Sequence, residues 1–199
     1  TPPQVMGWPV IHGGKSCLIL APTGSGKTLA AFLAGIDWLA KRLMAEEEKV
    51  WGVQILYVSP LKSLANDVRK NLLRPLAELA DVAEAMGAPW PEIRVALRTG
   101  DTPPRERAAI ARHPPHILIT TPESLNLMLT SGMRTSLGAV RYLIVDEVHA
   151  LAGSKRGVFL SLVLERLEEE RAGNDEVRMT NAGGNDEIRM TNDESNGEG

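Results

Sequence analysis

Two short segments of the sequence hold the residue types that phosphate chemistry requires. Residues 21–28 read Ala-Pro-Thr-Gly-Ser-Gly-Lys-Thr, and residues 146–149 read Asp-Glu-Val-His. The first segment matches the glycine-rich phosphate-loop pattern except that alanine replaces its opening glycine. The second places two carboxylates directly after an apolar run. Together they predict a site for a nucleoside triphosphate and its metal ion.

The residue types of the glycine-rich segment fit phosphate binding. Gly24 and Gly26 let backbone N–H groups turn toward an anion without a Cβ in the way. Lys27 is expected to reach the β and γ phosphates, and the Thr28 hydroxyl to coordinate Mg²⁺. A helix that begins near Lys27 would point its positive N-terminal end at the same anion. The predicted nucleotide contacts are Thr23, Gly24, Ser25, Gly26, Lys27 and Thr28.

The acidic pair suggests two roles for two neighbouring carboxylates. A carboxylate at the carboxyl end of a strand can hold Mg²⁺, usually through water, and this is the role expected of Asp146. Glu147 would then orient and polarise the attacking water. Two acids after an apolar strand can also form an ordinary solvated turn. The phosphate loop upstream favours the catalytic interpretation.

The elements that must position these residues alternate between strand and helix. The apolar runs predict strands at 18–20, 53–58, 93–97, 117–120 and 142–145. The segments between and after them predict helices at about 29–44, 64–79, 105–112, 123–130 and 158–170, with an interruption near Pro75. Strands that are apolar throughout are typical of a parallel sheet buried on both faces. The sequence therefore predicts an α/β fold with helices covering both faces of a parallel sheet.

Composition narrows the class of protein. Hydrophobic residues make up 43% of the 199 residues and aromatics 4%, so the core must rest on Leu, Ile, Val and Ala. No apolar stretch reaches the roughly 20 residues that span a membrane, and no signal peptide pattern is present, so we expect a cytoplasmic protein with no membrane partner.

The single cysteine, Cys17, excludes an intrachain disulfide and lies in an apolar run that predicts a buried thiol. Because the first residue is Thr1, we expect the sequence to begin inside a longer reading frame.

The C-terminal segment differs from the rest of the chain. Residues 173–181 recur almost unchanged as residues 184–192, and a third copy starts at Asn192. Residues 171–199 carry a net charge of −4, which leaves +1 for residues 1–170. So polar a repeat predicts disorder rather than a packed unit, although its Asn-Asp-Glu clusters could also ligate calcium. We expect a domain at 1–170 and a polar tail at 171–199.

Taken together, the motifs resemble superfamily 2 helicases of the DEAD/DEAH type, and most of all their large helicase-related (Lhr) group. The resemblance runs from Thr1 to about Glu168. It rests on Thr1–Gln4 with Gly7-Trp-Pro and Gly14, and on Ala21–Leu33, Tyr57–Asp67, Arg98–Asp101, Thr120–Leu125 and Asp146–Gly157. It implies a RecA-like P-loop domain that uses ATP and Mg²⁺.

The resemblance also implies roles for further residues. Gln4 would read adenine through its amide, and His149 would couple the nucleotide site to the nucleic-acid side. Loops at strand ends would follow a single-stranded DNA backbone through hydroxyls, N–H groups and one lysine, without reading bases. These predicted nucleic-acid contacts are Ser59, Pro60, Lys62, Thr99, Gly100, Thr121, Pro122, Glu123 and Ser124. For Lys155 and Arg156, nucleic-acid contact and simple solvation both stay open.

Parts of the family pattern are not found in the sequence. A second RecA-like domain, which supplies arginines to the transition state, is expected in the full protein but is absent here. The Ser/Thr-Ala-Thr strand that should follow the helix at Glu165 is also missing, so the domain is expected to be incomplete at its C-terminal end. In the family this strand lies between the phosphate-loop strand and the acidic-pair strand. We therefore expect unpaired backbone groups in the sheet and poor folding of the isolated segment.

Three functional interpretations follow. The first is the ATP-binding motor segment of an ATP-dependent DNA helicase that moves along single strands, with 3′ to 5′ polarity by family analogy. The second is a non-catalytic remnant that binds nucleotide or nucleic acid without turnover. The third is another P-loop ATPase, such as a transporter or a restriction motor, which the strand-end and Lhr-like motifs disfavour.

Overall fold

A sheet of four parallel strands forms the centre of the molecule. The computed structural model describes residues 1–22, 24–45 and 50–190, with side chains up to residue 173. The strands are β1 (Ile55–Val58), β2 (Val95–Arg98), β3 (Ile117–Thr120) and β4 (Tyr142–Val145), in the order β2-β3-β1-β4. Ile55 of β1 lies in register with Ile117 of β3 and Tyr142 of β4. The carboxyl ends of all four strands therefore lie at the same end of the sheet.

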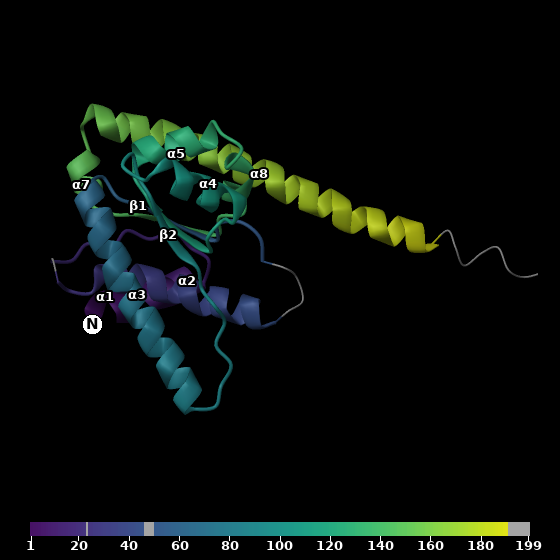
Figure 1. Ribbon diagram of the computed structural model, residues 1–199, viewed down its shortest axis with the longest axis horizontal. Coiled ribbons are helices and arrows are strands. Elements are labelled where there is room, and N and C mark those ends of the chain that lie inside the picture. The colour runs from purple at the N-terminus through teal and green to yellow at the C-terminus, as the bar shows by residue number, and fades with distance from the viewer. Residues whose placement is uncertain (23, 46–49, 191–199) are drawn as a thin grey trace, which may run out of the picture.

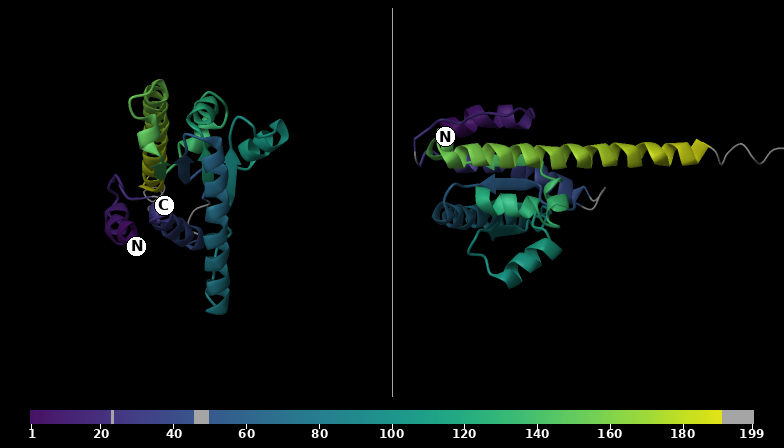
Figure 2. Two further views of the ribbon diagram at one scale, coloured as in Figure 1. Left: turned by 90° about the vertical axis from the view of Figure 1, so that its left-hand side faces the viewer. Right: turned by 90° about the horizontal axis from the view of Figure 1, so that it is seen from above.

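Helices cover both faces of this sheet (Figures 1 and 2). They are α1 (Pro2–His12), α2 (Lys27–Met44), α3 (Lys62–Ala85), α4 (Pro104–Arg112), α5 (Pro122–Leu129), α6 (Arg134–Leu137), α7 (Val148–Leu151) and α8 (Lys155–Met190). Helices α2 and α3 pack on one face, and α5, α6 and the first part of α8 on the other. The predicted fold class, α/β with a parallel sheet covered on both faces, is confirmed.

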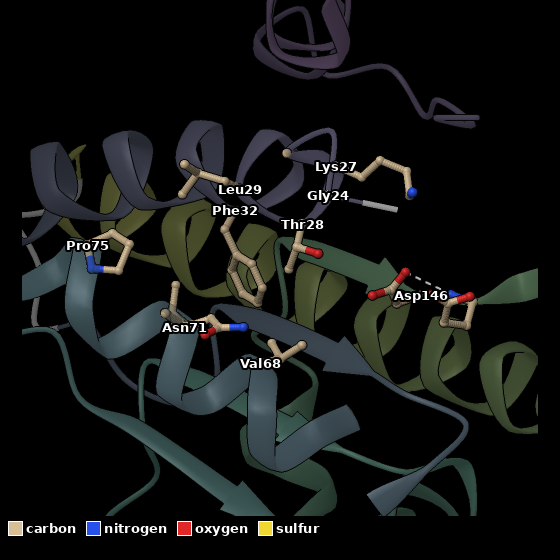
Figure 3. Close-up of a pocket in the computed structure, with 12 residues that line it drawn as sticks. Gly24, Lys27, Thr28, Leu29, Phe32, Val68, Asn71, Pro75 and Asp146 are labelled. Atoms are coloured by element: carbon tan, nitrogen blue, oxygen red, sulfur yellow. Dashed lines mark hydrogen bonds between the residues drawn. The ribbon is translucent and has the colours of Figure 1, made fainter. Parts of the chain in front are cut away.

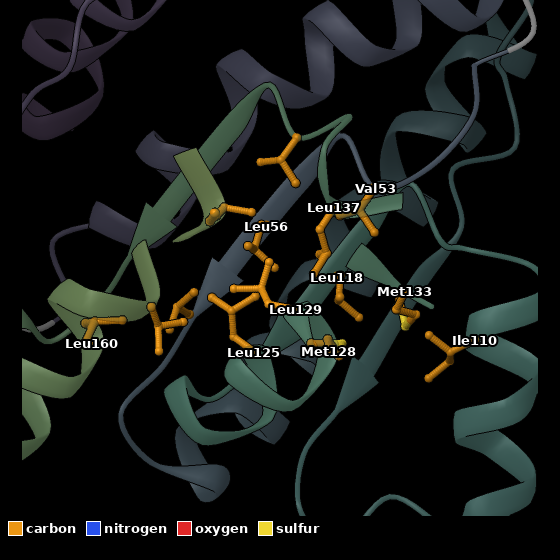
Figure 4. Packing of buried hydrophobic residues seen from close by; sticks show 14 of the residues in the cluster. Val53, Leu56, Ile110, Leu118, Leu125, Met128, Leu129, Met133, Leu137 and Leu160 are labelled. Atoms are coloured by element: carbon orange, nitrogen blue, oxygen red, sulfur yellow. The ribbon is translucent and has the colours of Figure 1, made fainter. Parts of the chain in front are cut away.

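The two-residue period of the strands creates a separate core on each face. In β1, Ile55 and Tyr57 point toward α2 and α3, whereas Leu56 and Val58 point toward α5 and α8. All four are fully buried. Figure 4 shows Leu56 in the core on the side of α5 and α8. A central parallel strand must be apolar on both sides because helices cover both.

Helix α2 lies unusually close to the sheet at Gly35. A Cβ at this position would be 3.0 Å from Ile55 Cδ1 and 3.3 Å from the Tyr142 ring. The absence of a side chain therefore lets the helix rest directly on β1 and β4. This contact sets where the N-terminus of α2, and with it the phosphate loop, lies relative to the carboxyl end of β4.

The strand predicted at residues 18–20 is wrong. These residues adopt no regular secondary structure, and Leu18 and Leu20 are 73% and 85% exposed. Cys17, predicted to be buried, is exposed as well. Within the described residues β4 is an edge strand paired only with β1, and residues 18–20 do not pair with its free side. An apolar run that pairs with no strand has no ladder hydrogen bonds to hold it extended.

Two helices extend beyond their predicted ends. Helix α3 continues through Pro75 to Ala85, because a proline removes one backbone hydrogen bond without preventing the turns around it from packing. Helix α8 starts at Lys155 and continues past residue 170 to Met190, away from the rest of the molecule (Figure 1). The domain boundary at 170 stays a prediction, and residues 191–199 lie outside the described range. No helix in the described ranges is apolar over a length that would cross a membrane.

The edge position of β4 leads to a testable difference in backbone protection. We expect amides of β1 and β3, each between two strands, to exchange slowest with deuterium. Amides of residues 18–20 should exchange fastest, and those of β4 at intermediate rates. Hydrogen–deuterium exchange followed by mass spectrometry, corrected for intrinsic rates, measures this order. Protection of residues 18–20 equal to that of β3 would show that they form a strand after all.

A buried histidine at the start of β3 makes the fold sensitive to acid. His116 is 3% exposed, and its Nδ1 accepts a hydrogen bond from the Arg94 N–H at 3.2 Å. Burial, with the nearby Arg94 charge, lowers the pKa of His116 from 6.5 to about 4. Its contribution to stability is thus present above pH 6.5 and is lost as the pH falls from 6.5 to 4. The loss is about 3 kcal/mol at pH 4.

Chemical denaturation at pH 7 and pH 4 tests this prediction. His116→Asn, which keeps an acceptor but cannot titrate, should lose less stability on acidification than the unsubstituted protein. The matched control is His113→Asn, because His113 is exposed and only three residues away. If both variants lose the same stability as the parent, His116 is not the acid-sensitive group.

Candidate nucleotide site

The phosphate loop has the backbone geometry that its glycines predict. Gly24 and Gly26 have φ of 79° and 89°, in the left-handed region that favours glycine. Helix α2 begins immediately afterwards at Lys27, as predicted. The loop N–H groups and the helix N-terminus therefore lie at one place. Thr23, a further predicted contact, lies outside the described residues.

The Lys27 ammonium is held by the loop itself. Its Nζ donates hydrogen bonds to the carbonyl oxygens of Ala21 (2.5 Å) and Pro22 (2.9 Å). Inside the same loop the Ser25 hydroxyl is buried and has no hydrogen-bond partner among the residues that the structure describes. A buried hydroxyl without a partner is costly, and an anion in the loop would supply one.

The acidic pair follows β4 directly and is tightly constrained. The Glu147 N–H donates to Asp146 Oδ1 at 2.8 Å, and the Tyr57 hydroxyl donates to Asp146 Oδ2. Glu147 has φ 50° and ψ 39°, a left-handed conformation that non-glycine residues rarely adopt. Such strain is typical of functional positions. Both oxygens of the Asp146 carboxylate are therefore oriented by the protein.

Tyr57, which positions Asp146, was not predicted from the sequence. It comes from the buried strand β1, and its ring stacks on Phe32 of α2 with centroids 5.3 Å apart. Burial, followed by the hydrogen bond to Asp146, raises the pKa of Tyr57. The phenol thus stays protonated and can donate its hydrogen bond to Asp146. The sequence signal was a single hydroxyl among the aliphatic residues Ile55, Leu56 and Val58.

One cavity of about 360 Å³ brings the predicted catalytic residues together. Lys27 and Thr28 line it from the start of α2, and Asp146 and Glu147 from the end of β4 (Figure 3). Its other walls were not predicted. They are formed by Leu29 and Phe32 of α2 and by Val68, Asn71, Leu72 and Pro75 of α3.

Gln4 lies next to the phosphate loop at Gly26, which is 22 positions further along the sequence. Its Nε2 is 3.4 Å from the position that a Cβ on Gly26 would occupy. Trp8 attaches α1 to α2 by donating a hydrogen bond from Nε1 to the Ala30 carbonyl oxygen at 3.1 Å. The arrangement places an amide beside the nucleotide cavity. Adenine recognition by Gln4 stays a prediction.

His149 extends from α7 toward solvent. Its Nε2 lies 3.3 Å from Glu147 Oε2, so it contacts the predicted water-orienting carboxylate. Within the described residues, no group of three or more His, Cys, Asp or Glu side chains could hold a metal ion. The coupling role of His149 stays a prediction.

The predicted nucleic-acid contacts gather at the carboxyl ends of β1, β2 and β3, but most of their side chains are buried. Ser59, Thr99, Thr121 and Ser124 are at most 5% exposed. The Ser59 hydroxyl donates to the Leu61 carbonyl oxygen, which shows how such groups shape the loops internally. The exposed members of the set are Lys62, Gly100 and Glu123.

Charged side chains on this surface are paired. Lys62 Nζ lies 2.6 Å from Asp101 Oδ1, above Gly100. Arg156, for which the sequence left two interpretations open, contacts Glu123 at 2.7 Å. Paired cations, rather than free hydroxyls, therefore face solvent at the strand ends.

Comparison with known proteins decides the family. Residues 1–182 match the DEAD/DEAH box helicase family model. The chain belongs to the DEAD/DEAH box helicase family. This helicase domain is 56% identical over 169 residues to the Lhr helicase/probable uracil glycosylase of Mycolicibacterium smegmatis. The aligned region covers 85% of this chain and 11% of that protein. It is 54% identical over 168 residues to the ATP-dependent helicase Lhr-Core of Methanocaldococcus jannaschii, covering 84% of this chain and 20% of the relative.

The solved structures give the same result for the helicase domain. The structure of Mycobacterium smegmatis helicase Lhr bound to ssDNA and AMP-PNP matches with a TM-score of 0.79 and 55% identity. The match covers 85% of this chain and 21% of that one. The predicted RecA-like fold and the similarity to the Lhr group are thereby confirmed. The chain spans only 11% and 20% of the length of the two curated relatives named above.

The hydrogen bond from Tyr57 to Asp146 can be tested directly in the helicase domain. Tyr57→Phe removes only the donor, so Asp146 would lose part of its orientation. Loss of such a supporting partner typically costs a metal site about tenfold or more in affinity. We expect a fluorescent ATP analogue to bind about tenfold more weakly in the presence of Mg²⁺. Tyr142→Phe is the matched control, and equal affinities for the two variants would contradict the assignment.

Proposed function

We propose that this chain is the ATP-binding motor segment of an ATP-dependent DNA helicase. The whole protein would couple ATP hydrolysis to movement along single-stranded DNA and to duplex unwinding. The observation that carries this proposal is the shared cavity of Lys27, Thr28, Asp146 and Glu147. Phosphate-binding groups and an oriented acidic pair on opposite walls of one cavity are the parts that phosphoryl transfer needs.

The donor set fits a magnesium ion as cofactor. The Thr28 hydroxyl and the Asp146 carboxylate both offer oxygen, the ligand that Mg²⁺ prefers. Both Asp146 oxygens already accept hydrogen bonds, which favours contact through ordered water over direct ligation. When bound, Mg²⁺ would neutralise charge on the phosphate oxygens.

The protein's own residues would do the remaining work. Lys27 would exchange its two loop carbonyls for phosphate oxygens, which offer a charged and stronger partner. Glu147, fixed in its strained backbone conformation, would accept a hydrogen bond from the attacking water and orient it. Gln4 would bind the adenine edge beside the loop.

Single-stranded DNA is the proposed partner, bound through its backbone at the strand ends. The buried Ser59, Thr99 and Thr121 hold the loops in shape, and Lys62 adds a positive charge. Support for this partner comes from the Lhr structure that contains ssDNA and AMP-PNP. The proposed contacts involve phosphates rather than bases, so binding would be independent of sequence.

The arginines that stabilise the transferring phosphoryl group would come from a second RecA-like domain of the whole protein. This chain alone would therefore bind ATP and turn it over slowly. The alternative is a remnant that binds nucleotide or nucleic acid and has no turnover. Hydrolysis measured with and without single-stranded DNA separates the two, because only a motor segment would respond to DNA with faster turnover.

Three single substitutions test the nucleotide site. Lys27→Ala should weaken binding of a fluorescent ATP analogue at least tenfold, since it removes the phosphate ligand. Glu147→Gln should leave binding near the parent value but reduce turnover by about 10²-fold or more. Lys41→Ala, at the other end of α2, is the control and should change neither quantity. Equal binding by the Lys27 and Lys41 variants would contradict the proposed site.

The salt dependence of DNA binding tests Lys62. Lys62→Ala should lower affinity for an oligothymidylate and reduce the slope of log K against log salt by about 0.7, the value for one phosphate contact on a single strand. The control Lys70→Ala removes an exposed lysine from the same helix. Fluorescence anisotropy at several salt concentrations gives both slopes. An unchanged slope for Lys62→Ala would remove Lys62 from the interface.

A further inference from the structure

Arg156 connects three segments that are far apart in the sequence. It belongs to the first turn of α8, and its Nε and Nη2 donate to Glu123 Oε1 at 2.9 and 2.7 Å. The same Nη2 donates to the Pro60 carbonyl oxygen at 2.7 Å. Glu123 lies in the first turn of α5, after β3, and Pro60 lies in the loop after β1. One guanidinium thus holds together two of the loops proposed to face DNA.

The other end of this connection is the acidic pair. From Glu147 the chain passes through the single-turn helix α7 and a tight turn to Arg156. In that turn the Ser154 hydroxyl donates to the Leu151 carbonyl oxygen at 2.7 Å, and the Gly157 N–H donates to the Ser154 carbonyl oxygen at 3.0 Å. A Cβ on Gly157 would collide with the Leu151 carbonyl. The segment between Glu147 and Arg156 is therefore short and tightly folded.

The ion pair contributes little to the stability of the fold. The Arg156 and Glu123 side chains are 45% and 52% exposed. Exposed pairs of this kind usually contribute little to folding. Partial burial opposes ionisation of Glu123, but hydrogen bonds from its own backbone and from Arg156 outweigh it and lower the pKa of its carboxyl. What the pair does fix is geometry, because a fork of guanidinium donors permits few orientations.

We propose that Arg156 is a positioning residue that couples the nucleotide site to the DNA-binding loops. A shift of the acidic pair on nucleotide binding would move α7 and the start of α8, and Arg156 would transmit it to the loops after β1 and β3. In the other direction, DNA that orders these loops would hold the acidic pair in place. This proposal rests on the function proposed above, because it assigns the path between the nucleotide site and the DNA-binding loops of that function.

A direct contact between Arg156 and a DNA phosphate is the competing interpretation, and Glu123 distinguishes the two. If Arg156 bound phosphate, Glu123→Gln would remove a competing negative charge and strengthen DNA binding. If Arg156 positions the loops, Glu123→Gln weakens the connection, but less than Arg156→Gln does, because Arg156 keeps its hydrogen bond to the Pro60 carbonyl oxygen.

The experiment measures thermodynamic coupling in the full chain. The dissociation constant of a labelled oligothymidylate is determined with and without Mg²⁺ and AMP-PNP, and the ratio of the two constants is the coupling factor. In Arg156→Gln we expect this factor to fall to within about twofold of unity, from the 5-fold or more typical of coupled sites, and in Glu123→Gln to fall by a smaller amount. Nucleotide affinity without DNA should be unchanged in Arg156→Gln.

Arg166→Gln is the matched control. Arg166 also joins α8 to α5, through a hydrogen bond from its Nη1 to Asn126 Oδ1 at 2.7 Å, but it lies away from the strand ends. This variant should keep the parent coupling factor. The Arg156→Glu, Glu123→Arg double variant should recover part of the coupling lost in Arg156→Glu alone. Thermal unfolding of each variant verifies that the fold is retained.

The outcomes separate the inference from the function on which it rests. If the parent protein binds neither AMP-PNP nor the oligothymidylate, the proposed function is wrong and the coupling proposal fails with it. If the parent shows coupling and Arg156→Gln keeps it, only the positioning role is wrong. Tighter DNA binding by Glu123→Gln, with a shallower salt slope in Arg156→Gln, would instead make Arg156 a phosphate ligand.

Discussion

The parallel register of β1 with its neighbours is the constraint on which the rest of the structure depends. Val58 of β1 is level with Thr120 of β3 and Val145 of β4, so three strands end together. The next residues along each strand begin the loops with Ser59, Thr121 and Asp146. Hydrogen bonds from the Ser59 N–H to the Thr120 carbonyl and from the Asp146 N–H to the Val58 carbonyl extend the ladder into these loops. Chemistry at this edge follows from strand pairing.

The two faces of the sheet carry different parts of the structure at the carboxyl ends of the strands. On the face of α2 and α3, the close packing at Gly35 and the stacked rings of Phe32 and Tyr57 place the phosphate loop opposite Asp146. On the other face, α5 and α8 carry the Glu123 and Arg156 pair. The acidic pair at the end of β4 belongs to both, because Tyr57 holds it from one side and α7 continues from it to the other.

Much of the fold and the centre of the site could be predicted because they depend on local patterns. The runs around Ile55, Ile117 and Tyr142 predicted β1, β3 and β4, since a doubly covered parallel strand must be apolar on both faces. The same apolar pattern wrongly predicted a strand at Leu18 and Leu20. The pattern describes the residue types that a buried strand requires, but it does not show whether another strand lies alongside to pair with it. Tyr57 could not be predicted, because its role depends on a hydrogen bond to a residue 89 positions away.

The sequence by itself determined which residues form the candidate nucleotide site, because a glycine-rich loop before a helix and two acids after a strand are local features with local geometry. It also determined the α/β class through the spacing of its apolar residues. Only the tertiary structure decided that the hydroxyls of the strand-end motifs turn inward, that Cys17 and residues 18–20 are exposed, and that Arg156 joins Pro60 to Glu123. These facts depend on which segments pack together, and strand order and helix packing are properties of the whole chain.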